Sequence, residues 1–236
     1  MCYNVPNTPA RERHGRGHSM KKKILIILGI VFAVASIIAA AILGPKWYVQ
    51  HADYGFHTPV SPQEEAARLK LLSVAESWLA ANEADGSHRT IVDLYNGHEP
   101  LAQGYLVTYE DNWCATFVSA VAIEAGYTHF IPTECGCERQ IGLFRELGRW
   151  VEDDAYVPLP GDIIYYSMAH APLTGDCTAW SDHVGLVVGT AGNYMKVIEG
   201  NCDDQVTYRY IKIDDNKIRG YAIPDYTQAL QEETHG

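Results

Sequence analysis

Three residues between positions 114 and 199 have the types and spacing that nucleophilic catalysis requires. Cys114 opens the apolar segment CATFVSAVAIEA, which is typical of a helix. The free N–H groups and the dipole of a helix N-terminus stabilise a thiolate and lower its pKa. His183 opens a predicted strand and Glu199 closes the next one, so an antiparallel hairpin with its turn at residues 190–193 would place them side by side. This pattern predicts a thiol nucleophile, an imidazole base and a carboxylate that orients the base.

Taken singly, these residues also have ordinary structural roles. A cysteine in an apolar helix is usually packed, a histidine at a strand end is usually solvated, and a glutamate before glycine usually belongs to a turn. Asn201 lies two residues after Glu199 and falls on the same side of the predicted hairpin. The convergence of these polar residues on one rim favours a catalytic site, but it does not by itself name a reaction.

Helices must position the cysteine, and the first part of the chain predicts several. Ser61 stands three residues before Glu64, which is the capping-box pattern of a helix start. The helix predicted there runs from residue 61 to about residue 84. Further helices are predicted at residues 89–96, 114–125 and 138–147, and the last two are followed by Gly126 and Gly148.

Strands must position the histidine and the glutamate, and strand-like segments begin after the sequence PLPG at residues 158–161. They are short, rich in β-branched and aromatic residues, and separated by Gly, Asn and Asp turns. The predicted strands are residues 162–167, 183–188, 194–199, 206–213 and 218–223. Helices followed by strands predict an α+β fold, with N-terminal helices packed on an antiparallel sheet.

Five short motifs occur in order along this part of the chain. They are WCATFVS from Trp113, PGDIIYY from Pro160, DHVGLV from Asp182, VIEGN from Val197 and RGYAIP from Arg219. In this order they resemble the CHAP family, the cysteine, histidine-dependent amidohydrolases/peptidases, over residues 70–224. The resemblance implies a papain-like fold and hydrolysis of an amide bond in peptidoglycan. The bond would lie either between glycan and stem peptide, as for an N-acetylmuramoyl-L-alanine amidase, or within the peptide, as for an endopeptidase.

Carried over position by position, the resemblance implies a role for each candidate site residue. Cys114 matches the nucleophile, His183 the general base and Glu199 the group that orients it, while Asn201 matches the polar residue that completes the site. The related NlpC-type peptidases usually place a histidine third, so Glu199 or Asn201 in that place favours CHAP. Such a site needs no metal and no organic cofactor. The departures from the family pattern are the segment 169–180 and the extra cysteines.

Several neighbouring residues have two interpretations. Asn112 is a candidate second donor to an oxyanion, beside the Cys114 backbone N–H. Asp182 is either a turn residue, which we favour, or a partner of His183. Four aromatic residues could line a substrate groove or be buried in the core: Trp113, Tyr165, Tyr166 and Trp180.

An uncharged run near the N-terminus predicts a membrane segment. Residues 24–43 contain no charged side chain and would span about 30 Å as a helix, the thickness of a bilayer core. The preceding KKK at residues 21–23 predicts a cytoplasmic N-terminus and a catalytic domain on the outer side of the cell membrane. The alternative is a signal peptide cleaved near Ala39 and Ala41, which would give a secreted protein.

The expected domain organisation follows from this segment. We expect a basic cytoplasmic segment at residues 1–23, a single-pass signal-anchor helix at 24–44, a linker at 45–61, a CHAP-like catalytic domain at 62–226 and a polar tail at 227–236. A start at Met20 would make residues 1–19 dispensable.

Charge is divided unevenly along the chain. The net charge is −11, but residues 1–46 carry seven Lys/Arg and one acidic residue, a net +6, and residues 47–236 carry 11 basic and 28 acidic residues, a net −17. The hydrophobic fraction of 47% excludes a disordered chain, and the acidic domain excludes a non-specific nucleic-acid binder. The resemblance implies peptidoglycan as the substrate, and the uncharged run predicts the membrane as a partner through one helix. No nucleic-acid partner is expected, and protein partners are unknown.

The remaining cysteines and the activity itself leave alternatives open. Cys135 and Cys137 form a C-x-C pair, and with Cys177 and Cys202 they could form a disulfide, a zinc site or free thiols. The alternative function is a catalytically inactive CHAP-like wall-binding or scaffold module, against which the complete set of site residues argues. A thiol-redox protein typically carries a C-x-x-C motif, which the sequence lacks.

Overall fold

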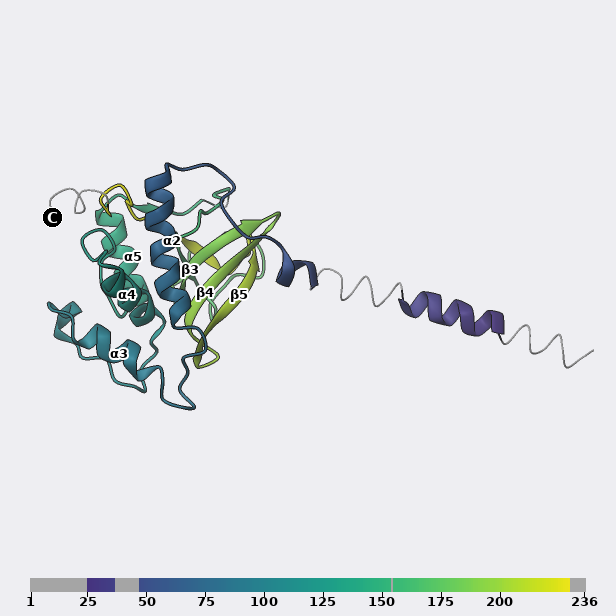
Figure 1. Ribbon diagram of the computed structural model, residues 1–236, viewed down its shortest axis with the longest axis horizontal. Helices are drawn as coiled ribbons and strands as arrows, with labels where there is room; N and C mark the ends of the chain where they lie inside the picture. The colour runs from purple at the N-terminus through teal and green to yellow at the C-terminus, as the bar shows by residue number, and fades with distance from the viewer. Residues whose placement is uncertain (1–24, 37–46, 154, 230–236) are drawn as a thin grey trace, which may run out of the picture. The chain divides into compact units, whose positions relative to one another are not determined.

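The computed structural model describes residues 25–36, 47–153 and 155–229 (Figure 1). The chain divides into two compact units, Met1–His51 and Ala52–Gly236. In the first unit, residues 25–36 and 47–51 are helical. The second unit contains all of the candidate site residues.

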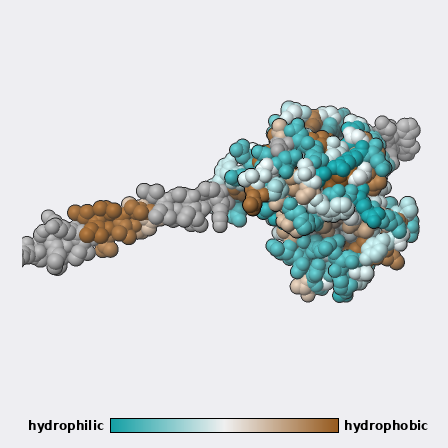
Figure 2. Space-filling view, turned by 180° about the vertical axis from the view of Figure 1, so that it is seen from behind, coloured by the Kyte–Doolittle hydropathy of each residue, from teal (hydrophilic) through white to brown (hydrophobic). Residues whose placement is uncertain are grey.

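The segment predicted to cross a membrane lies partly outside the described residues. Its described stretch, residues 25–36, is helical and exposed, and its side chains form a continuous apolar surface, brown in Figure 2. Among the described helices, none is both long enough and apolar enough to span a bilayer. Met20, Ala39, Ala41 and the last residues of the predicted tail fall outside the described part of the chain.

Helix α2 (Pro62–Ser77) begins as the capping box predicts. The Ser61 side chain accepts a hydrogen bond from the Glu64 N–H at 3.1 Å, and Pro62 occupies the first turn. The predicted end at residue 84 is wrong. The chain leaves the helix after Ser77, and Ala80 takes a left-handed φ of 68°, which a right-handed helix cannot contain.

The other helices lie close to their predicted positions. Helices α3 (Arg89–Asn96) and α4 (Cys114–Ala125) have the predicted bounds, and α4 ends where Gly126 takes a φ of 77°. Helix α5 (Cys137–Glu146) is displaced by one residue from its prediction. The short 3-10 helix η1 (Ala102–Gly104) was not predicted.

The strands form a six-stranded antiparallel sheet in the order β1-β6-β2-β3-β4-β5. They are β1 (Trp150–Val151), β2 (Ile163–Tyr166), β3 (His183–Ala191), β4 (Tyr194–Cys202), β5 (Gln205–Lys212) and β6 (Ile218–Ala222). Strand β1 was not predicted because two residues are too few to show alternation. The predicted α+β class, with helices and an antiparallel sheet, is confirmed.

The helices cover one face of this sheet (Figure 1). Helix α4 packs on β3 and β4, and α2 and α3 pack against α4. The main core between them includes Phe117 of α4 and Ile198 of β4, both fully buried. A smaller apolar cluster, including Val187 and Val197, lies on the opposite face of the same strands.

A buried ion pair fixes α2 to the start of β2. Arg68 donates from Nη1 to the Asp162 carboxylate and to the Pro160 carbonyl, both at 2.9 Å. The second Asp162 oxygen accepts from the Leu159 N–H at 2.9 Å and from the Tyr156 hydroxyl. The Asp162 residue is fully buried, so every polar contact it has is made within the protein.

Part of the segment predicted as a linker pairs with the sheet. Gly55 and Thr190 of β3 exchange two backbone hydrogen bonds of 3.3 and 3.2 Å. This close approach depends on Gly189, because a Cβ atom there would lie 2.6 Å from the Gly55 nitrogen.

Candidate active site

Helix α4 presents Cys114 as its first residue, where the backbone N–H groups of the first turn have no partner within the helix. The cysteine is 3% exposed. The preceding residue, Trp113, is fully buried and donates from Nε1 to Glu83 at 2.9 Å. The buried and hydrogen-bonded Trp113 therefore fixes where the helix begins and where the Cys114 thiol lies.

A glycine allows β4 to approach the start of α4. A Cβ atom at Gly200 would lie 2.4 Å from Cβ of Phe117 and 2.9 Å from Cζ3 of Trp113. Any larger residue would therefore force the strand and the helix apart. The glycine of the VIEGN motif thus sets the separation between the helix of Cys114 and the strand of Glu199.

His183 and Glu199 face each other across the β3–β4 hairpin. The antiparallel pairing of the two strands places Nε2 of His183 2.8 Å from Oε2 of Glu199. A Cβ atom at position 185 would lie 2.7 Å from Cγ of Glu199, so Gly185 leaves the room that this side chain needs. The Tyr166 ring stacks on the imidazole at a centroid distance of 5.9 Å. Two strands and an aromatic ring therefore hold the imidazole in one orientation.

Arg209 of β5 binds the far side of the same carboxylate. Its Nε lies 2.8 Å from both Glu199 oxygens, and its Nη2 lies 3.2 Å from the Cys202 sulfur. Glu199 is fully buried, and burial would raise its pKa, but hydrogen bonds and charges from His183 and Arg209 outweigh burial and lower it. The carboxylate therefore remains charged beside the imidazole.

The thiol and the imidazole shift each other's proton affinity. Hydrogen bonding to Cys137 is the largest cause that lowers the pKa of Cys114; burial opposes it, and the hydrogen bond and charge of His183 lower it further, from 9.0 to about 5. Burial lowers the pKa of His183, but Cys114 and Glu199 together raise it from 6.5 to about 10. At neutral pH the pair is therefore a thiolate and an imidazolium, the reactive form of a cysteine nucleophile.

Cys137, the first residue of α5, completes the surroundings of the thiolate. Its Sγ lies 3.8 Å from Sγ of Cys114, and it is itself buried. Two helix N-termini thus converge on one pair of sulfur atoms. The sequence identifies Cys137 only as half of a C-x-C pair, because nothing local shows that α5 begins beside the start of α4.

Asn201 lies beside the site, in contact with another asparagine. It has a left-handed φ of 54°, and its Nδ2 donates to Oδ1 of Asn112 at 3.3 Å. Within the described residues, Asn201 makes no hydrogen bond to His183 or Glu199. The structure therefore brings Cys114, His183 and Glu199 together and places Asn201 with Asn112, two residues before the cysteine.

The sequence analysis missed Arg209 and the role of Cys137. Arg209 had a detectable signal, because it is the one charged residue in the otherwise uncharged strand segment VTYRYI. A charge at a central position of an aromatic strand favours a nearby counter-charge. Its identity as a partner of Glu199 depends on the β4–β5 register, which the sequence does not specify.

The structure also separates the residues that had two interpretations. Trp113, Tyr165 and Tyr166 are fully buried, whereas Trp180 is 69% exposed. Asp182 accepts backbone hydrogen bonds from Met168 and Ala169 at 2.6 and 2.7 Å, which is the expected turn role.

The cysteines and metal-ligand candidates were also left open by the sequence. All five cysteines in the described part of the chain are free thiols. The described residues contain no group of three His, Cys, Asp or Glu side chains arranged to hold a metal ion.

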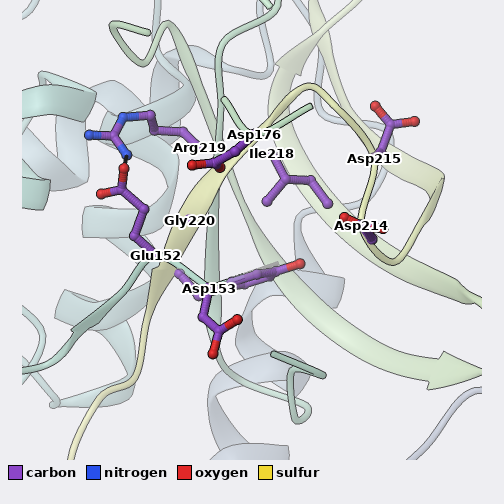
Figure 3. Close-up of a pocket in the computed structure, with 9 residues that line it drawn as sticks. Glu152, Asp153, Asp176, Asp214, Asp215, Ile218, Arg219 and Gly220 are labelled. Atoms are coloured by element: carbon purple, nitrogen blue, oxygen red, sulfur yellow. Dashed lines mark ion pairs between the residues drawn. The ribbon is translucent and has the colours of Figure 1, made fainter. Parts of the chain in front are cut away.

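Two polar hollows lie outside this site. One, of about 330 Å³, adjoins Arg209 and is lined also by Lys212, Lys217 and Tyr194. The other is acidic and surrounds the Arg219–Glu152 ion pair (Figure 3). The residues that line these two hollows include neither Cys nor His, so neither hollow offers a nucleophile and base of the kind found at Cys114.

Comparisons of this chain with protein-family models, with curated proteins and with solved structures found no match. The chemistry of the site is therefore the basis from which a function can be inferred.

Proposed function

We propose that this protein is a CHAP-like cysteine amidohydrolase/peptidase with a papain-like fold, which hydrolyses an amide bond of peptidoglycan through an acyl-enzyme. The observation that carries the proposal is the buried arrangement of three groups: His183 interacts with the Cys114 thiol and is bound at 2.8 Å by Glu199. The order of the five sequence motifs supports the substrate class.

In the acylation step, the Cys114 thiolate attacks the amide carbonyl carbon. The carbonyl oxygen takes up the negative charge, and the tetrahedral intermediate then collapses with cleavage of the C–N bond. The His183 imidazolium gives its proton to the leaving amine, which departs neutral. Glu199 keeps the imidazole in the orientation that this transfer requires, and Arg209 keeps Glu199 ionised.

In the deacylation step, neutral His183 takes a proton from water, and the hydroxide attacks the thioester on Cys114. The Cys114 thiolate leaves and is stabilised by the positive charge of the protonated His183. The acid product is released and the ion pair is regenerated. Both steps use only side chains and backbone groups of this chain.

We assign two donors to the oxyanion of the proposed reaction. The first is the backbone N–H of Cys114 at the start of α4. For the second we propose the side-chain amide of Asn112, whose Oδ1 accepts a hydrogen bond from Asn201 and whose Nδ2 is left to donate to the oxyanion. One such donor is typically worth about 3 kcal/mol of transition-state stabilisation.

Location at the wall is part of the same proposal. Residues 24–44 serve as a single-pass anchor in the cell membrane, with the N-terminus cytoplasmic and the domain from residue 62 outside. The anchor, and not bulk charge, brings the domain to its substrate, since residues 47–236 carry a net charge of −17.

Digestion of purified peptidoglycan by the full-length protein in detergent tests the proposal. Mass analysis of the new termini should show free stem peptides for an amidase, or cleaved stems and bridges for an endopeptidase. Cys114→Ala should release nothing, while the matched control Cys135→Ala should act like the wild type. Absence of new termini from the wild-type protein would overturn the proposal and favour a catalytically inactive wall-binding module.

A further inference from the structure

The two sulfur atoms at the site form a close pair, although only that of Cys114 forms a bond in the proposed hydrolysis. Sγ of Cys114 and Sγ of Cys137 are 3.8 Å apart, and each belongs to the first residue of a helix, α4 or α5. A disulfide needs about 2.05 Å between the sulfur atoms, so the two sulfur atoms, which are already in contact, must approach by about 1.8 Å for the bond to form. The residues are 23 positions apart in the sequence, which is why no C-x-x-C motif marks them.

The two thiols have complementary acidities. The pKa of Cys114 is lowered to about 5, whereas hydrogen bonding to Cys114, burial and the Cys114 charge raise the pKa of Cys137 well above its ordinary value. At neutral pH, Cys114 is therefore a thiolate that can attack a disulfide, whereas Cys137 is a protonated thiol.

A covalent modification of Cys114 would remove the main cause of the raised pKa of Cys137. The hydrogen bond to the Cys114 thiolate is the largest cause of the raised pKa of Cys137, and the Cys114 charge is a further cause. A mixed disulfide at Cys114 carries no such charge, so the pKa of Cys137 falls as soon as its neighbour is modified. Once Cys114 is modified, Cys137 no longer lies beside a thiolate, although burial still raises its pKa. It can then lose its proton and attack the modified sulfur in a second step.

The other described cysteines have different surroundings. The Cys135 sulfur donates to Glu134 at 3.6 Å, and the Cys202 sulfur accepts from Arg209 at 3.2 Å. Cys135 is close to Cys137 in sequence and partly exposed, so it is the natural control residue.

We propose that Cys114 and Cys137 form a reversible disulfide that switches the hydrolase off in the presence of a low-molecular-weight disulfide. In the first step, the Cys114 thiolate attacks one sulfur of the oxidant; the S–S bond of the oxidant breaks and one thiolate leaves. In the second step, Cys137 loses its proton and attacks Cys114, and the second thiolate leaves. The protein loses two electrons and the proton of Cys137, and the oxidant is reduced to two thiolates, which take up this proton and one from solvent to become thiols. The nucleophile is then no longer available for acylation.

The effect on activity depends on the proposed hydrolase function, whereas the thiol exchange does not. The test therefore reads the two separately. Full-length reduced protein is incubated with oxidised glutathione at neutral pH, then analysed by peptide mapping and intact mass, and in parallel by digestion of peptidoglycan.

We expect the wild type to show a cross-link between the peptides of Cys114 and Cys137, with loss of two hydrogen atoms and complete loss of digestion. Dithiothreitol should restore both the mass and the activity. Cys137→Ser should stop after the first step and retain one glutathionyl group on Cys114. Cys135→Ser should behave like the wild type.

A wild-type protein that forms no cross-link between these two peptides would overturn the proposal, as would a Cys137→Ser variant that still loses two hydrogen atoms through Cys114. If the reduced protein digests no peptidoglycan but the cross-link forms, the hydrolase function fails and the disulfide stands. The mapping of the wild type decides the question even if a variant does not fold.

Discussion

The second unit contains two buried carboxylates that each bind an arginine, and they have different roles. Asp162 and Glu199 are both fully buried. Asp162 binds Arg68, a backbone N–H and a tyrosine hydroxyl, which all keep their protons near neutral pH. Glu199 binds Arg209 on one side and His183 on the other, and the imidazole exchanges its proton with solvent or substrate in the proposed reaction.

The two environments shift the carboxylates in opposite directions. Burial is the largest influence on the pKa of Asp162, and it raises that pKa despite the opposing charge of Arg68. For Glu199, His183 and Arg209 together outweigh burial and lower the pKa. A buried ion pair therefore does not identify a catalytic site by itself. What distinguishes Glu199 is a titrating partner that in turn interacts with a thiol.

The largest effect on activity is expected from removing the Cys114 thiol, which belongs to the same network as Glu199. Cys114→Ala should lower the rate of peptidoglycan digestion by about 10⁴-fold or more, because no other group can form the acyl-enzyme. The thermal unfolding temperature should change little, since alanine fills a helix start well. A variant that retains a tenth of the wild-type rate would contradict the assignment.

The next effect is expected from the orienting carboxylate. Glu199→Gln should lower kcat by about 10³- to 10⁴-fold, because an amide neither holds the imidazolium charge nor enforces the ring orientation. Stability should suffer less, because the Arg209 side chain is 31% exposed and can be solvated. Steady-state kinetics and urea unfolding of the same sample separate the two effects, and an unchanged kcat would remove Glu199 from the mechanism.

The matched change at Asp162 should reduce stability and leave catalysis unchanged, the opposite of the change at Glu199. Asp162→Asn should lower the free energy of unfolding by about 3 to 5 kcal/mol, because it leaves the buried Arg68 charge without its partner. The kcat per folded molecule should remain that of the wild type. A variant with normal stability and impaired catalysis would reverse the roles given to the two networks.

The pH dependence of kcat/KM should reflect the thiol and imidazole pair. Protonation of Cys114 below about 5 and loss of the His183 proton above about 10 both destroy the reactive pair, so activity should be bell-shaped with a plateau between these values. Activity should fall about tenfold per pH unit beyond each limit. A profile that rises only near pH 9 would indicate a thiol of ordinary acidity.

The smallest effect is expected at the exposed aromatic residue near the site. Trp180 is 69% exposed and lies three residues before His183, so it is available to contact substrate. Trp180→Ala should raise KM by about two- to tenfold with kcat unchanged, as expected for the loss of about 0.5 to 1.5 kcal/mol of aromatic contact. Leu173→Ala, in the same segment and 97% exposed, is the control and should leave KM unchanged.

The parts of the site that could be predicted from the sequence depend on local signals. The start of α4 at Cys114 and the β3–β4 hairpin follow from an apolar run and from strand composition. The hairpin brings the His183 and Glu199 side chains together diagonally, because its register places Gly185 opposite Glu199. The predicted end of α2 was wrong because the sequence around Ala80 does not reveal the left-handed backbone of that residue.

The remaining parts of the site depend on tertiary register. Arg209 reaches Glu199 only because β5 is antiparallel to β4 with one particular pairing, and Cys137 reaches Cys114 only because α5 begins beside the start of α4. Neither relation is encoded in the spacing along the chain. The contact between Asn201 and Asn112 has the same origin.

The thiolate absorbance of the protein alone tests the central claim most directly, because it needs no substrate. The ultraviolet difference between wild type and Cys114→Ser is followed as the pH is raised from acid to alkaline values. A thiolate signal that rises with a midpoint near pH 5 is the predicted result, since the pKa of Cys114 is lowered to about 5. A midpoint near the ordinary value of 9.0 would contradict the account.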